Sequence, residues 1–454
     1  MKHVSEREKR RLNFNRKDRW KQRELDDIMK NFDVQQAKFK DYSKLSREAN
    51  IVNLKEFKSI DEIYYYLDEI LKEGFLEEHI GMALDVFIKD INFFKSEDLN
   101  SRQFKNFVSQ LAQNIVSLSS DSNIYKTAKF LDWYNIDNKN CWYNLERLIT
   151  YRKDKFNRDI LLKILDHFAH QNEGSMEFYD MYQYLFWSEN FKDVSNSEFI
   201  SLGYNLYITR QGYSQFFYDY YQKLLPRISH KDSTFDLLKV LQTFSEISEF
   251  YMDIYKKIED IILSRYEQLE LSDATVISCA YSVAGMGSEM LFEYLEKLII
   301  ANFNKLDKDG FREVIRALIV SLNGSQEFFQ LVKHNIQNNL DLFNLTELVY
   351  IVKAYHEKGQ GDKQIFEILE KKISESLSNE KEILLEEICA IADCLCNTKV
   401  FSREFQKMFE HVISQRIKDI TGNPKVSKYL YNLFYISGMC SVGLMNVLHR
   451  AYAS

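Results

Sequence analysis

Two histidines in one predicted helix have a spacing that could bind a metal. His167 and His170 are three residues apart, so their imidazoles share one helix face, and Asp166 stands beside them. Zinc accepts imidazole nitrogens as ligands, but it needs three or four of them, and no further ligand follows at a recognisable spacing. We therefore expect these residues to belong to a structural helix, and we predict no bound metal and no other cofactor.

Three of the six cysteines lie close together in the sequence, at Cys389, Cys394 and Cys396. No cysteine pair has the CxxC spacing of a redox or zinc motif. Cys389 falls in a recurring apolar position, where a buried thiol behaves as a small apolar side chain. We expect reduced cysteines that pack in the core, as is usual in a reducing compartment.

Two Gly-x-Gly segments, Gly285–Gly287 and Gly359–Gly361, invite comparison with phosphate-binding loops. A phosphate loop needs a preceding strand and the pattern GxxxxGK[ST], and the chain has neither. It also lacks Gly-x-Ser-x-Gly, HExxH and the set of protein-kinase motifs. We predict that both segments are turns and that the protein is not an enzyme.

The first 24 residues carry basic and aromatic side chains that suit nucleic-acid binding. They hold ten Lys or Arg against four Asp or Glu, a net charge of +6 in a chain whose net charge is −7. Basic side chains neutralise phosphates, and aromatic rings stack on bases. The predicted contact residues are Lys9, Arg10, Arg11, Arg16, Lys17, Arg19, Trp20, Lys21 and Arg23. The same segment would also suit an anchor in an acidic protein partner or a solvated tail, and the residues alone leave these alternatives open.

Composition indicates the elements that must position these residues. The 454 residues include only 2 Pro and 14 Gly, with 45% hydrophobic and 14% aromatic residues. Proline and glycine disfavour helix interiors, so their scarcity predicts helices and excludes collagen, Pro-rich disorder and a turn-dense β-sandwich. No apolar run approaches the roughly 20 residues that cross a bilayer, so we predict no membrane span.

A period of 37 to 38 residues runs through the chain from about residue 158. Six glycines lie one or two periods apart: Gly174, Gly212, Gly287, Gly324, Gly361 and Gly438. Five residues after the glycine position stands an aromatic column: Tyr179, Phe217, Tyr255, Phe292, Phe329 and Phe366. An apolar stripe at helical spacing precedes each glycine. Each unit is predicted to be a helix A, a turn in which glycine adopts the left-handed conformation, as in Lys353–Gly361, and a helix B.

A single helical hairpin cannot bury both of its apolar faces, so successive units must stack. We predict an all-α fold, an α-solenoid of about eight 37-residue helix-turn-helix repeats over residues 158–454. Residues 1–50 are predicted to be a basic extended arm. Residues 51–157 are predicted to be an N-terminal helical region of degenerate repeats or a cap.

The hairpin unit resembles a known repeat family. A 37-residue unit with an aromatic second helix, and with a segment such as Glu347–Tyr355, resembles the heptatricopeptide repeats of organellar RNA-associated proteins, which are related to octotricopeptide and FAST-kinase-like proteins. The resemblance covers about 158–454 and implies a mitochondrial or plastid location and a role in RNA stability, RNA processing or the organellar ribosome. Such proteins often end in an α/β RAP domain, which this sequence does not show, so no nuclease-like activity is implied.

The charge distribution and the resemblance together predict a non-enzymatic helical-repeat scaffold in a mitochondrial ribonucleoprotein, associated with the ribosome. Its arm would contact RNA or a partner, and its repeats would contact proteins of a large organellar assembly. The alternative is a structural accessory subunit of a mitochondrial respiratory-chain or ATP synthase complex. Beyond residue 24 the net charge is −13, which disfavours direct RNA binding by the repeats.

Overall fold

The computed structural model describes residues 77–89, 99–188, 191, 193–245, 251–379 and 383–453. These residues form helices and no strand, which confirms the predicted all-α fold class. No helix within these ranges is both long enough and apolar enough to cross a membrane. The chain divides into two compact units, Met1–Phe217 and Tyr218–Ser454, and each is described separately.

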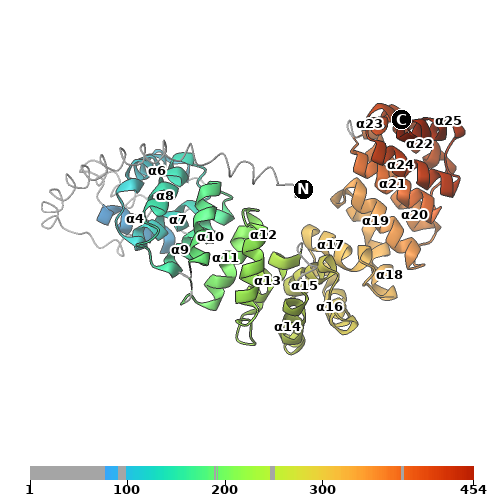
Figure 1. Ribbon diagram of the computed structural model, residues 1–454. Helices are drawn as coiled ribbons and strands as arrows, with labels where there is room; N and C mark the ends of the chain where they lie inside the picture. The colour runs from blue at the N-terminus through green and yellow to red at the C-terminus, as the bar shows by residue number, and fades with distance from the viewer. Residues whose placement is uncertain are drawn as a thin grey trace, which may run out of the picture. The chain divides into compact units, whose positions relative to one another are not determined.

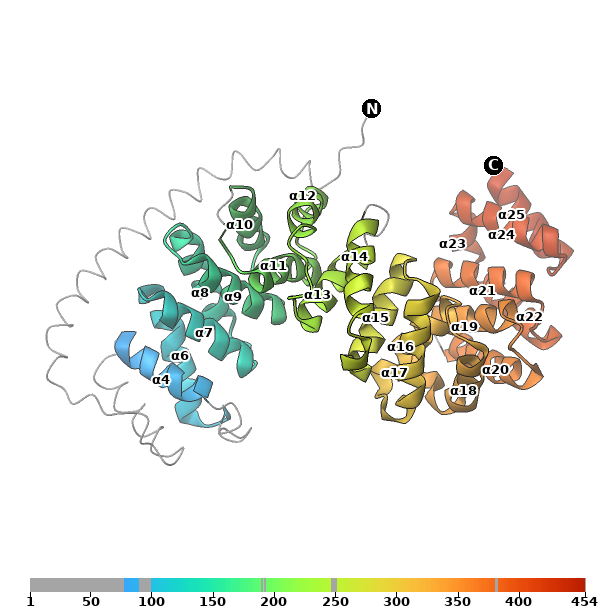
Figure 2. The same cartoon turned by 90° about the horizontal axis from the view of Figure 1, so that it is seen from below.

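The described helices of the first unit alternate between two rows. They are α4 (Glu77–Lys89), α6 (Arg102–Asn114) with the 3₁₀ turn η4 (Ile115–Ser117), α7 (Asp121–Trp133), α8 (Lys139–Arg152), α9 (Arg158–His170), α10 (Met176–Trp187) and α11 (Asn196–Ile208). Helix α7 packs against α4 and α9, and α9 packs against α11, while α8 contacts α6 and α10 (Figure 2). The next helix, α12 (Ser214–Leu224), contains the division between the units.

The second unit continues the alternation. Its helices are α13 (Thr234–Ser245), α14 (Met252–Leu263), α15 (Leu271–Ala284), α16 (Glu289–Ala301), α17 (Lys308–Val314), α18 (Gln326–Asn335), α19 (Leu345–Glu357), α20 (Lys363–Asn379), α21 (Leu385–Thr398), α22 (Arg403–Gln415), α23 (Ile417–Thr421), α24 (Pro424–Ser437) and α25 (Val442–Ala453). Short segments are the 3₁₀ turns η6 (Tyr266–Gln268), η7 (Phe303–Lys305) and η9 (Ile336–Leu342) and the π-helical η8 (Ile315–Val320), which continues α17.

In the second unit one helix of each hairpin packs against its counterpart in the next. Helices α13, α15, α17 with η8, α19, α21 and α24 contact one another in that order (Figure 1). We call these the A helices, together with α7, α9 and α11 of the first unit. The second helix of each hairpin, such as α16 or α20, is a B helix. This stacking of hairpins agrees with the helical-repeat architecture expected from the sequence.

The turn between an A helix and its B helix has the same backbone conformation in successive hairpins. A left-handed residue follows the A helix at Asn172, Arg210, Gly285, Leu322 and Gly359. A backbone N–H just beyond it donates to a carbonyl in the last turn of the A helix, at Phe168, Leu206, Tyr281, Leu318 and Tyr355. Both Gly-x-Gly segments are such turns.

The prediction that one glycine position supplies the left-handed residue is wrong in detail. The left-handed residue lies two positions before the repeat glycine. Gly174 and Gly287 also have positive φ, of 100° and 98°, whereas Gly212, Gly324 and Gly361 do not. Gly438, with φ of 67°, occupies the earlier position, so it does not match the other five glycines. Spacing alone could not separate two positions in one short turn.

At two turns the repeat glycine lies directly against the aromatic column. A Cβ at Gly361 would lie 2.2 Å from Cζ of Phe366, and one at Gly212 would lie 2.3 Å from Cε2 of Phe217. A Cβ this close would have to displace the ring five residues later. At Gly324 the nearest atom is instead the carbonyl oxygen of Leu318, at 2.9 Å, and before Tyr255 the glycine position holds Phe250.

Buried tyrosines join consecutive hairpins. Tyr281 donates its hydroxyl to the carbonyl of Tyr255 at 2.8 Å, and Tyr355 donates to the carbonyl of Phe329 at 2.9 Å. In both pairs the rings meet edge to face, with centroids 5.3 Å and 5.1 Å apart. Each tyrosine belongs to an A helix and each acceptor to the B helix before it. The aromatic column thus also supplies the contacts between hairpins.

Carboxylates of one B helix cap the next B helix. Glu296 accepts the Ser325 N–H at 2.8 Å, and Glu370 accepts the Ser402 N–H at 2.7 Å. The same contact joins Glu146 to Ser175, Glu259 to Ser288 and Glu410 to Ser441. At the N-terminus of α20 the arrangement of charge is reversed. The N-cap is the acidic Asp362, and the preceding B helix supplies the basic Lys333 as its partner. Each contact complements a helix N-terminus and holds neighbouring B helices in register.

Candidate interaction surfaces

The predicted contact residues of the N-terminal arm lie outside the described residues. They are Lys9, Arg10, Arg11, Arg16, Lys17, Arg19, Trp20, Lys21 and Arg23. The remaining candidates lie on the described helices. They comprise the histidine pair, the cysteines, the A-helix charges, two clefts and the last hairpin.

The histidine pair faces a buried carboxylate on the neighbouring A helix. His167 Nδ1 lies 2.8 Å from Oδ2 of Asp132, and His170 Nδ1 lies 3.2 Å from Oδ1. Gln171 donates from Nε2 to Oδ1 at 2.7 Å. In the part of the chain that the structure describes, no group of three or more His, Cys, Asp or Glu is arranged to hold a metal. The spacing of the two histidines serves one contact between α7 and α9.

Asp132 is charged in spite of its burial, with 8% of the residue exposed. Desolvation raises the pKa of its carboxyl, but the hydrogen bonds from His167 and Gln171 and the nearby imidazoles outweigh that effect and hold the pKa below 3.8. The cluster therefore stabilises the contact between α7 and α9 through a charged, hydrogen-bonded carboxylate.

The clustered cysteines pack between helices. Cys394 and Cys396 are buried and Cys389 is half-buried, and all three are free thiols. The Cys394 thiol donates to the carbonyl of Val349 at 3.6 Å, and Ser437 donates to Cys396 Sγ at 3.1 Å. Burial raises the pKa of Cys394 to about 12, so almost no thiolate forms at neutral pH. This geometry favours packing over redox or metal chemistry.

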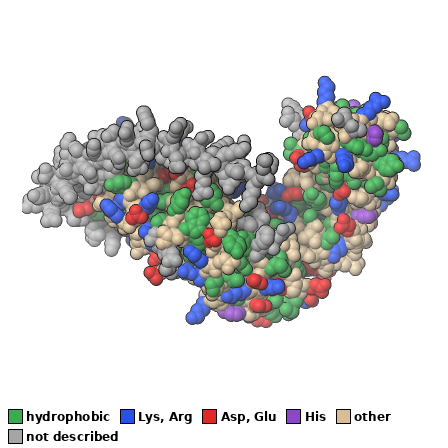
Figure 3. All heavy atoms as spheres, viewed as in Figure 1, with side chains coloured by type: hydrophobic (Ala, Val, Ile, Leu, Met, Phe, Trp, Pro, Cys, Tyr) green, Lys and Arg blue, Asp and Glu red, His purple; other side chains and the backbone are tan. Residues whose placement is uncertain are grey.

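Charges on the A helices of the second unit pair with each other. Arg312 donates from Nη2 and Nε to Oε1 of Glu347 at 2.8 Å and 3.2 Å, and Lys353 Nζ lies 2.6 Å from Oδ2 of Asp393. Arg316 also reaches Glu347, at 3.7 Å. In each pair the base lies on the earlier helix and the acid on the following one. Figure 3 likewise shows basic and acidic side chains interspersed over the described part of the visible face.

A groove of about 440 Å³ crosses three consecutive A helices, α15, η8 and α19. The π-helical turn η8 contributes Arg316, and such turns are frequent at functional sites. However, Arg316 donates to Glu313 at 3.1 Å, and the Cys279 thiol donates to the same carboxylate at 2.9 Å. Because these polar groups bind each other, the groove offers mainly Val283 and Tyr350, which are 50% and 43% exposed, as a contact surface.

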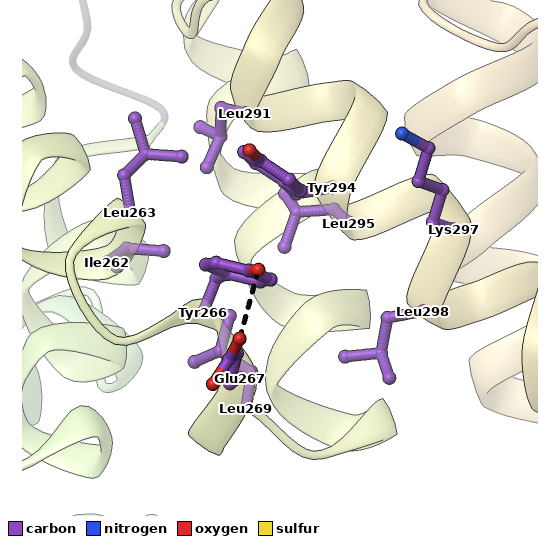
Figure 4. Close-up of a pocket in the computed structure, with 10 residues that line it drawn as sticks. All are labelled: Ile262, Leu263, Tyr266, Glu267, Leu269, Leu291, Tyr294, Leu295, Lys297 and Leu298. Atoms are coloured by element: carbon purple, nitrogen blue, oxygen red, sulfur yellow. Dashed lines mark hydrogen bonds between the residues drawn. The ribbon is translucent and has the colours of Figure 1, made fainter.

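An apolar cleft of about 400 Å³ lies beside the B helices α14 and α16 (Figure 4). Tyr266 and Tyr294 stack in it, with centroids 4.5 Å apart and an interplanar angle of 19°. Its other walls are mainly leucine and isoleucine, and the Tyr266 hydroxyl donates to Glu267 at 3.2 Å. Such a cleft suits an apolar side chain of a partner.

The last hairpin exposes large apolar side chains. Tyr435 is 70% exposed, Ile436 is 84% exposed and Val442 is 76% exposed. The Tyr431 ring stacks on Tyr435 with centroids 5.7 Å apart. Residues 424–454 contain Lys425, Lys428 and Arg450 but no Asp or Glu. We call the surface formed by Lys428, Tyr431, Tyr435, Ile436 and Val442 the terminal face.

Sequence reasoning missed the B-helix caps, the paired A-helix charges and the terminal face. A signal was present for two of them. Glu146, Glu259, Glu296 and Glu370 recur one, two or three repeats of 37 to 38 residues apart, and acidic residues disappear after Glu410 except for Asp419. Tabulating charge along the repeat, as well as apolar residues, would have revealed both patterns.

No protein-family model matches this chain, and no curated protein matches it. The surfaces above are therefore assigned by their own geometry. The likeness to heptatricopeptide repeats stays a prediction from the residue pattern.

Proposed function

We propose that the protein is a non-enzymatic helical-repeat scaffold in a mitochondrial ribonucleoprotein, associated with the ribosome. The observation that carries this proposal is the stack of hairpins whose A-helix charges neutralise one another. Such a stack presents extended packing surfaces to proteins. Among the described residues, the A-helix bases Arg312, Arg316 and Lys353 are paired with carboxylates and so do not form the free row of Lys and Arg that phosphate binding requires.

In this proposal RNA contact falls to the basic arm. The net charge of +6 in residues 1–24 contrasts with −13 over the remaining residues. Phosphate neutralisation dominates nonspecific RNA affinity, so the segment with the positive charge is the one that would carry it. Trp20, among these bases, would add stacking on single-stranded bases.

A second candidate function is a structural accessory subunit of a respiratory-chain or ATP synthase complex. The observation that favours it is the apolar character of the terminal face and of the cleft at Tyr266 and Tyr294. Exposed apolar patches on a soluble fold mark contacts with other proteins. In that case the arm anchors the chain in an acidic partner.

The arm can be tested directly with single-stranded RNA. A variant in which the eight predicted basic contacts become Gln and Trp20 becomes Leu should lose about tenfold or more in RNA affinity at low salt. The salt dependence should also flatten, because each lost phosphate contact removes about 0.7 from the slope for single strands. Fluorescence anisotropy with a labelled RNA measures both quantities.

A matched control changes exposed lysines of B helices, Lys297, Lys363, Lys371 and Lys407, to Gln. The control should retain most of the RNA affinity. Unchanged, salt-sensitive binding by the arm variant would refute RNA contact through the arm.

Native purification of the tagged protein, with and without RNase, separates the two candidate functions. Ribosomal RNA and ribosomal proteins that copurify, and that RNase releases, support the ribonucleoprotein. Respiratory or ATP synthase subunits retained after RNase support the accessory subunit.

A further inference from the structure

We propose that the cleft beside α14 and α16 binds a short basic segment of a partner protein. An apolar side chain of that segment enters the cleft, and the Lys or Arg side chains that flank it meet the carboxylates nearby. The proposal rests on the proposed scaffold role, and it names the chemistry of one partner. It does not depend on whether the arm contacts RNA.

One wall of the cleft is a residue that departs from the repeat. Tyr266 is the first residue of the 3₁₀ turn η6, and Phe303, 37 residues later, is the first residue of η7. Phe303 is 7% exposed, and its ring packs against Phe311 and Phe328 with centroids 5.7 and 6.2 Å away. Tyr266 is 39% exposed and stacks on Tyr294 of α16 instead. The ring that is buried in the next repeat is thus an exposed wall here.

The rest of the cleft is apolar and is formed by ordered core residues. Ile262, Leu291 and Leu295 line it, and each is at most 1% exposed. Leu263 and Leu298, which also line it, are half-buried. Figure 4 shows these side chains around the two stacked tyrosine rings. Because the cleft is preformed, an aliphatic or aromatic side chain gains from burial in it without first ordering the site.

The charge near the cleft is negative. Residues 251–301, which span α14 to α16, contain nine Asp or Glu and four Lys or Arg, a net charge of −5. Glu267 lines the cleft, and Asp260 precedes Leu263 of the wall by one helical turn. Both acids are exposed, and neither forms an ion pair within the described ranges. A basic segment would supply the partners that these carboxylates lack.

The lysine in the wall does not offset this charge. Lys297 Nζ lies 2.7 Å from Oε1 of Glu293, and both side chains are 66% exposed. The pair is neutral as a whole, so the unpaired carboxylates decide the sign of the charge near the cleft. Charges of opposite sign across an interface favour the matching partner and disfavour others.

The same charge argues against two other occupants. The phosphates of RNA would be repelled by the surplus of carboxylates, since RNA affinity depends on phosphate neutralisation. A second copy placed cleft to cleft would oppose Glu267 with Glu267, and like charges across an interface are unfavourable. The basic arm of this chain shares the chemistry of the proposed segment, so the test includes the arm variant.

Three synthetic peptides test the proposal with the full-length chain. The basic leucine peptide carries central leucines flanked by Lys. The acidic leucine peptide has Glu in place of Lys, and the basic serine peptide has Ser in place of Leu. Fluorescence anisotropy should show saturable binding of the basic leucine peptide and at least about tenfold weaker binding of the other two.

Two variants of the chain place the binding in the cleft. Tyr266→Ala should weaken the basic leucine peptide about tenfold, because it removes an exposed wall of the cleft. Glu267→Lys should weaken the basic leucine peptide and strengthen the acidic leucine peptide, because it reverses a charge in the wall.

Matched controls are Tyr350→Ala, at a tyrosine that is 43% exposed in the groove of the A helices, and Glu327→Lys, at an exposed acid of α18. Neither control should change the affinity of any peptide by more than about twofold. All four altered residues are exposed, so the circular dichroism and thermal unfolding of each variant should match those of the unaltered chain.

Four results would overturn the proposal. Equal affinity for the two basic peptides would remove the apolar anchor, and equal affinity for the two leucine peptides would remove the basic flanks. A loss in Tyr350→Ala as large as that in Tyr266→Ala would place binding outside the cleft. Binding at least about tenfold tighter in the arm variant would assign the cleft to the arm of this chain. Failure of the arm to bind RNA, by contrast, leaves the expected peptide results unchanged.

Discussion

Two contacts between consecutive A helices use opposite chemistry. Between α7 and α9, Asp132 is 7% exposed at its side chain and is bound by His167, His170 and Gln171. Between α17 and α19, Glu347 is 13% exposed and is bound by Arg312, whose own side chain is 37% exposed. His167 is only 12% exposed, whereas His170 is 79% exposed, so water can replace His170 but hardly His167. We expect burial, rather than the number of polar contacts, to set what each interface contributes to the free energy of unfolding.

Removing the buried carboxylate should have the largest effect. Asp132→Ala leaves the two imidazoles and the Gln171 amide without their acceptor, so we expect a loss of about 3 kcal/mol in the free energy of unfolding. All described tryptophans, Trp133, Trp142 and Trp187, lie in the first unit, so tryptophan fluorescence in a urea titration follows this unit.

The control is Asp85→Ala, which removes an exposed partner of Lys126 in the same unit. It should cost at most about 1 kcal/mol. If Asp132→Ala costs no more than Asp85→Ala, burial does not distinguish the two contacts and the comparison fails.

The pH dependence of the free energy of unfolding should give the second-largest difference between the two interfaces. The pKa of Asp132 in the folded chain lies below the value of 3.8 expected when unfolded, so the unfolded state binds more protons as pH falls. The stabilisation is therefore present above pH 3.8 and is lost as pH falls through the folded-state pKa.

Urea midpoints measured by tryptophan fluorescence across this acid range should show the effect as a difference between the unaltered chain and Asp132→Ala. The difference should shrink as pH falls. A difference that stays constant to the lowest pH would mean that the carboxylate is not selectively stabilised in its charged form.

The partly exposed ion pair should have the smallest effect. A double-mutant cycle with Arg312→Ala and Glu347→Gln should give a coupling energy of about 0.5–1 kcal/mol. Glu347 also accepts the Asn344 N–H at 2.9 Å as part of a helix cap, and the cycle removes that contribution from the coupling. Circular dichroism suits this measurement, because the second unit contains no tryptophan.

Salt sharpens the contrast between the two interfaces. Added sodium chloride should reduce the Arg312–Glu347 coupling, because solvent-exposed charges are screened, but should change the Asp132→Ala effect little. Equal salt sensitivity in both would show that Asp132 is solvated in the native state.

The fold class could be predicted from sequence because the repeat is visible in single residue types. Gly361 and Phe366 recur with their period, and at this turn the ring lies directly against the glycine, so a packing contact coincides with the sequence pattern. The exact turn could not be predicted, since Gly359 and Gly361 differ only in backbone conformation. Of the candidate sites, the arm is predicted from its charge and lies outside the described residues.

The sequence by itself determined the helix period, the place of a turn in each hairpin and the aromatic column, because these depend on residues within one hairpin. Only the tertiary structure decided what each hairpin meets. The imidazole of His167 binds a carboxylate 35 residues away, and Glu296 caps a helix that begins 29 residues later. These contacts join different hairpins, so they depend on how the hairpins stack and not on the residue order within one hairpin.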